Sequence, residues 1–119
     1  MNRRSVHAER QRWERALETY LHRCFAQRTA ARVSEFAASV GRSRSYLARV
    51  FPALFAQTVR EALRVRQLAH AEQLLRTTSS SLDDIALRSA FGTQMTFHRI
   101  FTALRGMTPQ EYRERWTKC

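Results

Sequence analysis

Apolar residues recur at intervals of three and four along almost the whole chain, and no stretch alternates as a half-buried strand does. This pattern predicts an all-α fold of about seven helices. Only three Gly and two Pro occur among the 119 residues, which favours long helices joined by short turns. The expected helices span roughly 5–27, 33–40, 44–54 and 59–76, with three more beginning at 82, 94 and 109.

Residues that favour helix starts support these boundaries. Ser43, Ser81 and Thr93 each precede an apolar-periodic stretch and suit the N-cap position. The letters TPQE at 108–111 form a capping box with Pro at the first helical position. The side chains expected to face the core are Trp13, Leu17, Tyr20, Leu21, Cys24, Phe25, Val33, Phe36, Ala37, Val40, Leu47, Val50, Phe51, Leu54, Ala62, Leu63, Leu68, Ala71, Leu74, Leu75, Phe97, Ile100, Phe101 and Leu104.

The sequence repeats itself after about fifty residues. SYLARVF at 45–51 and MTFHRIF at 95–101 share one spacing of apolar and Arg positions, and the short helices before them also align. Ala37 and Ala86 are small where two helices would cross, and Gly41 allows the positive φ of a sharp turn. Each half therefore has the layout of a helix-turn-helix unit, whose second helix enters the major groove of DNA. A chance likeness between two amphipathic helix pairs is the alternative.

The outer faces of the two second helices carry groove-sized polar residues. At about 100° per residue, Ser45, Ala48, Arg49 and Pro52 lie opposite the apolar face of the first. The same geometry places Met95, His98, Arg99 and Thr102 outward on the second, with Gln94 and Thr96 beside them. An Arg at the matching position of each copy can donate to O6 and N7 of guanine. Solvated helix surface is the competing interpretation, and it is the better one for a single Ser or Ala.

The charge points to a polyanionic partner. The formal net charge is +11 with only 10 acidic residues, and all basic residues except Lys118 are Arg. Such a field favours DNA, RNA or an anionic membrane, although Arg bias in genome composition can produce exposed Arg residues too. No apolar run suits a membrane span and no leader indicates export. Cys24 fits a core position, Cys119 has no evident role, and the four His lack ligand spacing, so neither a metal site nor a cofactor is expected.

From Val33 to Tyr112 the chain resembles the DNA-binding domain of the AraC/XylS family of transcription regulators. The marks are SYLARVF, AEQLL at 71–75, AFGTQMTFHRIF at 90–101 and GMTPQEYR at 106–113. The resemblance implies two helix-turn-helix units that occupy successive major grooves. It places base contacts at Ser45, Ala48, Arg49, Gln94, Met95, Thr96 and Arg99. We expect backbone contacts from Arg42, Ser43, Arg44, Arg60, Arg64, Arg66, Arg88, Thr93 and His98.

Three parts follow from this layout: 1–58 with the first unit, 59–76 as a linker helix, and 77–119 with the second unit and a C-terminal helix. Several positions depart from the family pattern. Ala90 and Ala56 stand where Gly is usual, so the second turn is either strained or differently shaped. Gln67 replaces a usual Arg, and Pro52 is expected to interrupt the first recognition helix, leaving that unit to grip phosphates more than bases.

The sequence thus predicts a sequence-specific, double-stranded DNA-binding regulator, expected to be a cytoplasmic, monomeric activator that also contacts RNA polymerase. The short length is similar to the stand-alone MarA/SoxS-type activators. The alternative is a protein-interaction module or decoy that acts on RNA polymerase or another regulator. An enzyme is disfavoured because the sequence has no nucleophile–base arrangement, phosphate-cradling Gly loop or paired carboxylates of catalytic type.

Overall fold

The computed structural model describes residues 3–117; Cys119 and Lys118 lie outside this range. Within it the chain forms seven helices and no strand, which confirms the predicted all-α class. The helices are α1 (Arg3–Gln27), α2 (Val33–Ser39), α3 (Arg44–Phe55), α4 (Val59–Thr77), α5 (Leu82–Arg88), α6 (Gln94–Arg105) and α7 (Pro109–Thr117).

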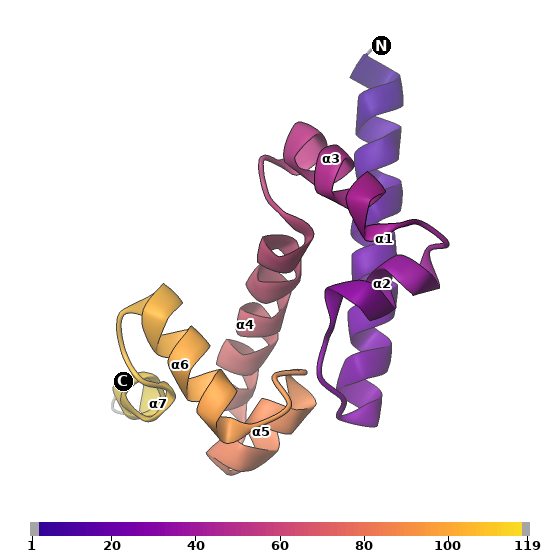
Figure 1. The fold of residues 1–119 in the computed structure, drawn as a ribbon. Coiled ribbons are helices and arrows are strands. Elements are labelled where there is room, and N and C mark those ends of the chain that lie inside the picture. Colours follow the sequence, from indigo (N-terminus) through magenta and orange to yellow (C-terminus); the bar gives the residue numbers. More distant parts are fainter. Residues whose placement is uncertain (1–2, 118–119) are drawn as a thin grey trace.

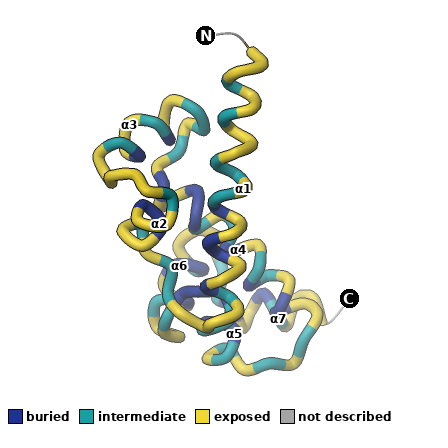
Figure 2. The backbone as a smooth tube through the Cα atoms, turned by 90° about the vertical axis from the view of Figure 1, so that its right-hand side faces the viewer, coloured by how far each residue is buried: buried dark blue, intermediate teal, exposed yellow. Residues whose placement is uncertain are grey.

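The helices form two groups joined by α4 (Figure 1). We call α1–α3 the first head and α5–α7 the second head. The molecule measures 49 × 27 × 21 Å, and its long direction includes the N-terminal turns of α1, which are exposed (Figure 2). With 19 residues at ~1.5 Å each, α4 is ~28 Å long and spans from one head to the other.

Each head has its own apolar core. The first core buries residues of α1, α2, α3 and the first turns of α4 around Leu17, Phe36 and Phe51. The second buries residues of α4 to α7 around Phe97 and Phe101. Ala90 is the exception, because it lies in the second head's turn but is buried in the first core.

Side-chain caps fix the starts of the recognition helices, as predicted. The hydroxyl of Ser43 accepts a hydrogen bond from the Tyr46 amide at 3.1 Å, and Thr93 accepts one from Thr96 at 3.1 Å. Ser81 caps α5 in the same way. The predicted box before α7 is present, since Thr108 and Glu111 exchange two hydrogen bonds of 2.9 and 3.1 Å. These caps satisfy amides that helix ends leave unpaired.

The two helix-turn-helix turns share one backbone conformation. Gly41 has φ +68° and Ala90 has φ +64°, so both lie in the left-handed region. The sequence left the second turn either strained or differently shaped. Its left-handed alanine shows that it is strained and has the same shape as the first turn. Ala56 ends α3 at φ +55°, in the place where Gly106 ends α6 at +75°. An L-residue in this conformation costs about 1–2 kcal/mol relative to an allowed one.

Two expectations at individual residues are wrong. Pro52 does not interrupt α3, which runs on to Phe55. Pro52 and Ala48 are both exposed, so the Ala48 carbonyl, which loses the Pro52 amide as its donor, stays open to water. Leu104 is not in the core but 54% exposed, because it lies in the last turn of α6, next to the end of that helix.

Cys24 is buried as predicted. None of the described helices has the length and apolar character required to cross a membrane.

Candidate nucleic-acid interface

The first recognition helix, α3, presents its predicted base-contacting residues to solvent. Ser45, Ala48 and Arg49 are all exposed, while Leu47 and Phe51 on the opposite face are fully buried. The Arg49 guanidinium carbon lies 6.0 Å from the centre of the Tyr46 ring, and that of Arg42 lies 4.8 Å from the same ring. Tyr46 thus holds two Arg side chains near the start of α3 by cation–π attraction.

The second recognition helix, α6, offers a more varied outer face. Gln94, Met95, His98 and Arg99 are exposed, and Met95 is 81% exposed although it is apolar. Thr96 is half-buried, and its hydroxyl lies 3.0 Å from that of Thr93. The outer face therefore combines an amide, an imidazole and a guanidinium with an apolar side chain that fits against a thymine methyl group.

A cavity of about 290 Å³ with a basic lining lies between the start of α2, the start of α3 and the first half of α4. Four guanidinium side chains line it, those of Arg32, Arg44, Arg60 and Arg64, and no carboxylate does. We call it the central basic groove. An adjoining hollow of about 360 Å³ shares Arg44 and Arg60 with it and is also lined by Ser45 and Ala48 of α3. The groove thus continues onto the outer face of the first recognition helix.

Electrostatics extend this groove toward α6. Burial lowers the pKa of Arg64, and the positive charges of Arg60 and Arg99 lower it further. Arg64 stays protonated at neutral pH, since guanidinium groups do not lose their proton in proteins. Its guanidinium carbon lies 5.7 Å from the centre of the Phe91 ring, at the turn before α6. Like charges gathered without a lining carboxylate raise the local potential and favour an anion.

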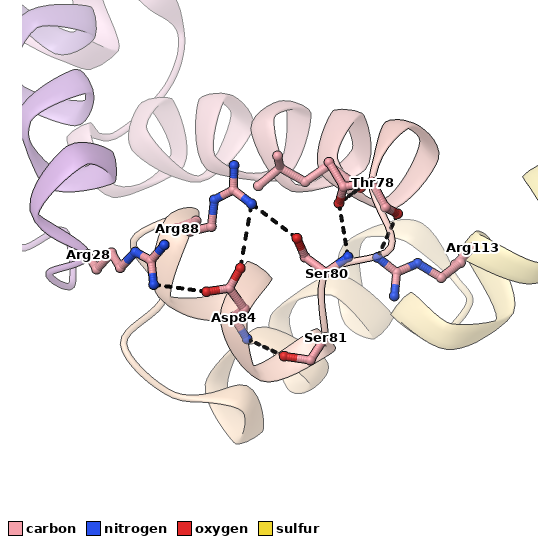
Figure 3. A network of polar contacts seen from close by, with 8 residues as sticks. Arg28, Thr78, Ser80, Ser81, Asp84, Arg88 and Arg113 are labelled. Atoms are coloured by element: carbon pink, nitrogen blue, oxygen red, sulfur yellow. Dashed lines mark hydrogen bonds and ion pairs between the residues drawn. The ribbon is translucent and has the colours of Figure 1, made fainter.

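The structure separates two predicted backbone-contacting residues from the groove. Arg66 lies about 200° around α4 from Arg64, and its guanidinium donates to the Ala62 carbonyl at 3.2 Å. Arg88 belongs to a polar network on α5 (Figure 3), where it contacts Ser80 at 3.1 Å and Asp84 at 3.5 Å.

The remaining expected backbone contacts lie at the exposed starts or outer faces of α3 and α6. They are Arg42, Ser43, Thr93 and His98.

Sequence reasoning missed two residues that shape this region. Arg32 lines the groove although it belongs to no helix, so no periodic pattern marks it. Gln67 is buried, and its amide nitrogen donates to the Ala90 carbonyl at 2.9 Å and to the Ser89 carbonyl at 3.3 Å. The sequence shows that Gln67 replaces the family's usual Arg, but it does not show that Gln67 bonds to the turn before α6. Among residues 3–117, no group of His, Cys, Asp and Glu could hold a metal ion.

Two helix-turn-helix units on one chain, with a basic groove that lies beside the first recognition helix and extends through Arg64 toward the second unit, define a bipartite DNA-binding domain. The family model described as "Helix-turn-helix domain" matches residues 36–115. The chain belongs to the AraC/XylS family of helix-turn-helix regulators and is a DNA-binding transcription regulator. That family is not enzymatic.

Relatives support this assignment over much of the chain. The regulatory protein SoxS of Salmonella typhimurium is 40% identical over 75 residues, 63% of this chain and 70% of SoxS. The probable transcription factor PqrA of Proteus vulgaris is 35% identical over 101 residues, 85% of this chain and 80% of PqrA. The transcriptional activator RhaR of Yersinia pseudotuberculosis is 41% identical over 56 residues, 47% of this chain and 19% of RhaR.

Solved structures share the fold. An AraC-type transcriptional regulator from Chromobacterium violaceum superposes with a TM-score of 0.66 at 25% identity, covering 85% of this chain and 91% of that one. The DNA-binding domain of the transcription factor AdpA, solved with a target DNA, gives 0.71 at 24% identity, covering 84% and 91%. The second likeness shows the fold alone.

Proposed function

We propose that the protein binds duplex DNA as a monomer, with α3 and α6 in successive major grooves, and that it activates transcription. Successive grooves on one face of the duplex are ~34 Å apart, and the ~28 Å length of α4 is close to that separation. Two unlike recognition faces on one chain fit a DNA site whose halves differ in sequence. Activation is supported by the relative RhaR, which is named an activator.

The central basic groove is the observation that carries the proposal. It lies beside α3, and Arg64 extends it toward Phe91 at the turn before α6, so we propose that the DNA backbone between the two major grooves lies here. Arg44, Arg60 and Arg64 would therefore contact phosphates, while the outer faces of α3 and α6 contact bases. The base contacts proposed are those of Ser45, Ala48, Arg49, Gln94, Met95, Thr96 and Arg99.

The salt dependence of duplex binding tests this proposal. Each phosphate contact neutralised by the protein contributes about −0.9 to the slope of log K against log salt. Arg60→Gln and Arg64→Gln should each make the slope shallower by about 0.9. Arg66→Gln is the matched control, because Arg66 is on the same helix but turned away from the groove, and it should leave the slope unchanged. A flat native slope would defeat the DNA proposal. Equal effects of all three changes would show that the groove has no special part in phosphate binding.

RNA polymerase is the second partner that we propose, because an activator of this kind has to recruit the enzyme. The chromosome of a bacterium lies in the cytoplasm, so we expect the protein there.

The competing proposal is a protein-interaction module or decoy without base contacts of its own. The two differ in one result: a decoy would bind duplex DNA weakly and without sequence preference. Catalysis forms no part of either proposal.

A further inference from the structure

The two heads are joined at a second place besides α4. The connection between α1 and α2, residues 28–32, lies against the turn between α5 and α6, residues 89–93 (Figure 1). The Ala31 amide donates to the Ala90 carbonyl at 2.9 Å. A Cβ added to Gly92 would lie only 3.1 Å from the Cβ of Ala30, so the two segments touch. We call this contact region, together with Gln67, the inter-head junction.

Ala90 is at the centre of the junction. Its carbonyl accepts two hydrogen bonds, one from the Ala31 amide of the first head and one from the Gln67 side chain of α4. The residue is 1% exposed, and it is buried in the first core. The turn of the second head is thereby fixed to the first head through both its backbone and its side chain.

A second set of contacts joins the end of α1 to α5 and to α4. The Arg28 guanidinium pairs with the Asp84 carboxylate at 3.0 Å, which links the end of α1 to α5 (Figure 3). The Phe25 and His70 rings stack with their centres 4.0 Å apart, which links α1 to α4. Since all of these contacts lie off the axis of α4, rotation of one head about the linker helix would break at least one of them.

We propose that the inter-head junction is a specificity-determining element that fixes the spacing between the two DNA half-sites that the protein accepts. The inference rests on the proposed two-groove binding. One inserted base pair moves the second half-site by about 3.4 Å along the duplex and rotates it by about 35°. A junction held by hydrogen bonds and a buried methyl group cannot follow that movement intact, whereas heads joined by α4 alone would have more freedom to do so.

The Ala90→Gly variant tests the inference, because it removes the buried methyl group and keeps a residue suited to φ +64°. Ala56→Gly is the matched control, since it makes the same change at a positive φ but at an exposed helix end outside the junction. Binding is measured on the native protein's preferred duplex and on duplexes with one base pair added or removed between the half-sites.

We expect the native protein and Ala56→Gly to lose about tenfold or more in affinity on either altered spacer, a loss comparable to that for a mismatched base pair. Ala90→Gly should lose about threefold or less, with its base preferences inside each half-site unchanged. Equal losses for all three proteins, or a native protein indifferent to spacing, would overturn the inference. A change of base preference in Ala90→Gly would also count against it.

Hydrogen exchange of the Ala31 amide supplies a readout that does not depend on DNA. The native amide should exchange slowly because it is bonded to Ala90, and it should exchange faster in Ala90→Gly but not in Ala56→Gly. If the native protein bound no duplex specifically, the two-groove proposal would fail while this measurement still reported on the junction. Rapid exchange in the native protein would show that the junction does not hold the heads, and would overturn the inference by itself.

Discussion

Ala56 and Ala90 have left-handed backbone conformations in which glycine avoids the steric cost of a Cβ. They differ in what their methyl groups do. The methyl group of Ala90 is buried in the first core, whereas Ala56 is exposed at the end of α3. Burial of one methyl-sized group contributes about 0.8 kcal/mol, so the strain at Ala90 is offset in part by packing and the strain at Ala56 is not.

The two positions should therefore respond differently to Gly. Ala56→Gly should raise the free energy of unfolding by about 0.5–1 kcal/mol, the relief of strain less the entropy that Gly costs. Ala90→Gly also loses its buried methyl group, so its net change should stay within about 1 kcal/mol of zero. Urea unfolding measures both. Clear destabilisation by Ala56→Gly would show that this helix end does not strain an alanine.

Base specificity should be concentrated at Arg99 rather than Arg49. The outer face of α6 has Gln94, Met95 and His98 around Arg99. The exposed residues beside Arg49 on α3 are the small Ser45 and Ala48. A bidentate contact to guanine discriminates by about 1–3 kcal/mol. Arg99→Ala should therefore weaken the preferred site about tenfold or more and spare non-specific binding, and Arg49→Ala should act more evenly on all DNA.

Binding assays on preferred and unrelated duplexes distinguish these effects once circular dichroism has shown that both variants are folded. If Arg49→Ala abolished discrimination while Arg99→Ala left it intact, the roles of the two helices would be reversed.

At the scale of elements, the helices could be predicted because their signals are local. Periodic apolar residues marked the buried faces, and the caps at Ser43, Thr93 and Thr108 marked the starts. The predictions for Pro52 and Leu104 failed for different reasons. Pro52 lies on the exposed face of α3, which continues to Phe55 and packs it against the first core. Leu104 lies in the last turn of α6, and its apolar character does not bury it there.

The contact between α1 and α4 predicts a pH dependence of stability. Burial lowers the pKa of His70, and the nearby Arg88 and His22 lower it further. The unfolded chain then binds the proton more readily, near pH 6.5, so the stability tied to neutral His70 is present above that pH. It should be lost as the pH falls through the unfolded and then the folded pKa.

His70→Phe keeps a ring against Phe25 and removes this titration. Urea unfolding between about pH 7 and 5 should therefore show a shallower decline for the variant than for the native protein. Because Arg28, Arg88 and His22 also line this site, the comparison uses the difference between the two curves. Parallel curves would mean that His70 titrates alike in the folded and unfolded chain.

At the scale of the whole molecule, the sequence predicted two heads and a linker helix but not how the heads meet. The repeat between 45–51 and 95–101 identified two similar units. The periodic apolar residues of 59–76 predicted the helix that connects them. The contact of Ala31 with Ala90 and the pair of Arg28 with Asp84 join segments with no shared pattern. The same limit applies to the central basic groove, since Arg32, Arg44 and Arg64 come together only in the folded chain.

The central claim is that one chain uses two unlike recognition helices on two successive grooves. Selection of bound duplexes from a random pool tests it most directly. We expect an enriched, asymmetric motif of about 20 bp with two conserved halves separated by about one helical turn. A motif confined to one half, a palindrome that requires two chains, or no enrichment at all would contradict it.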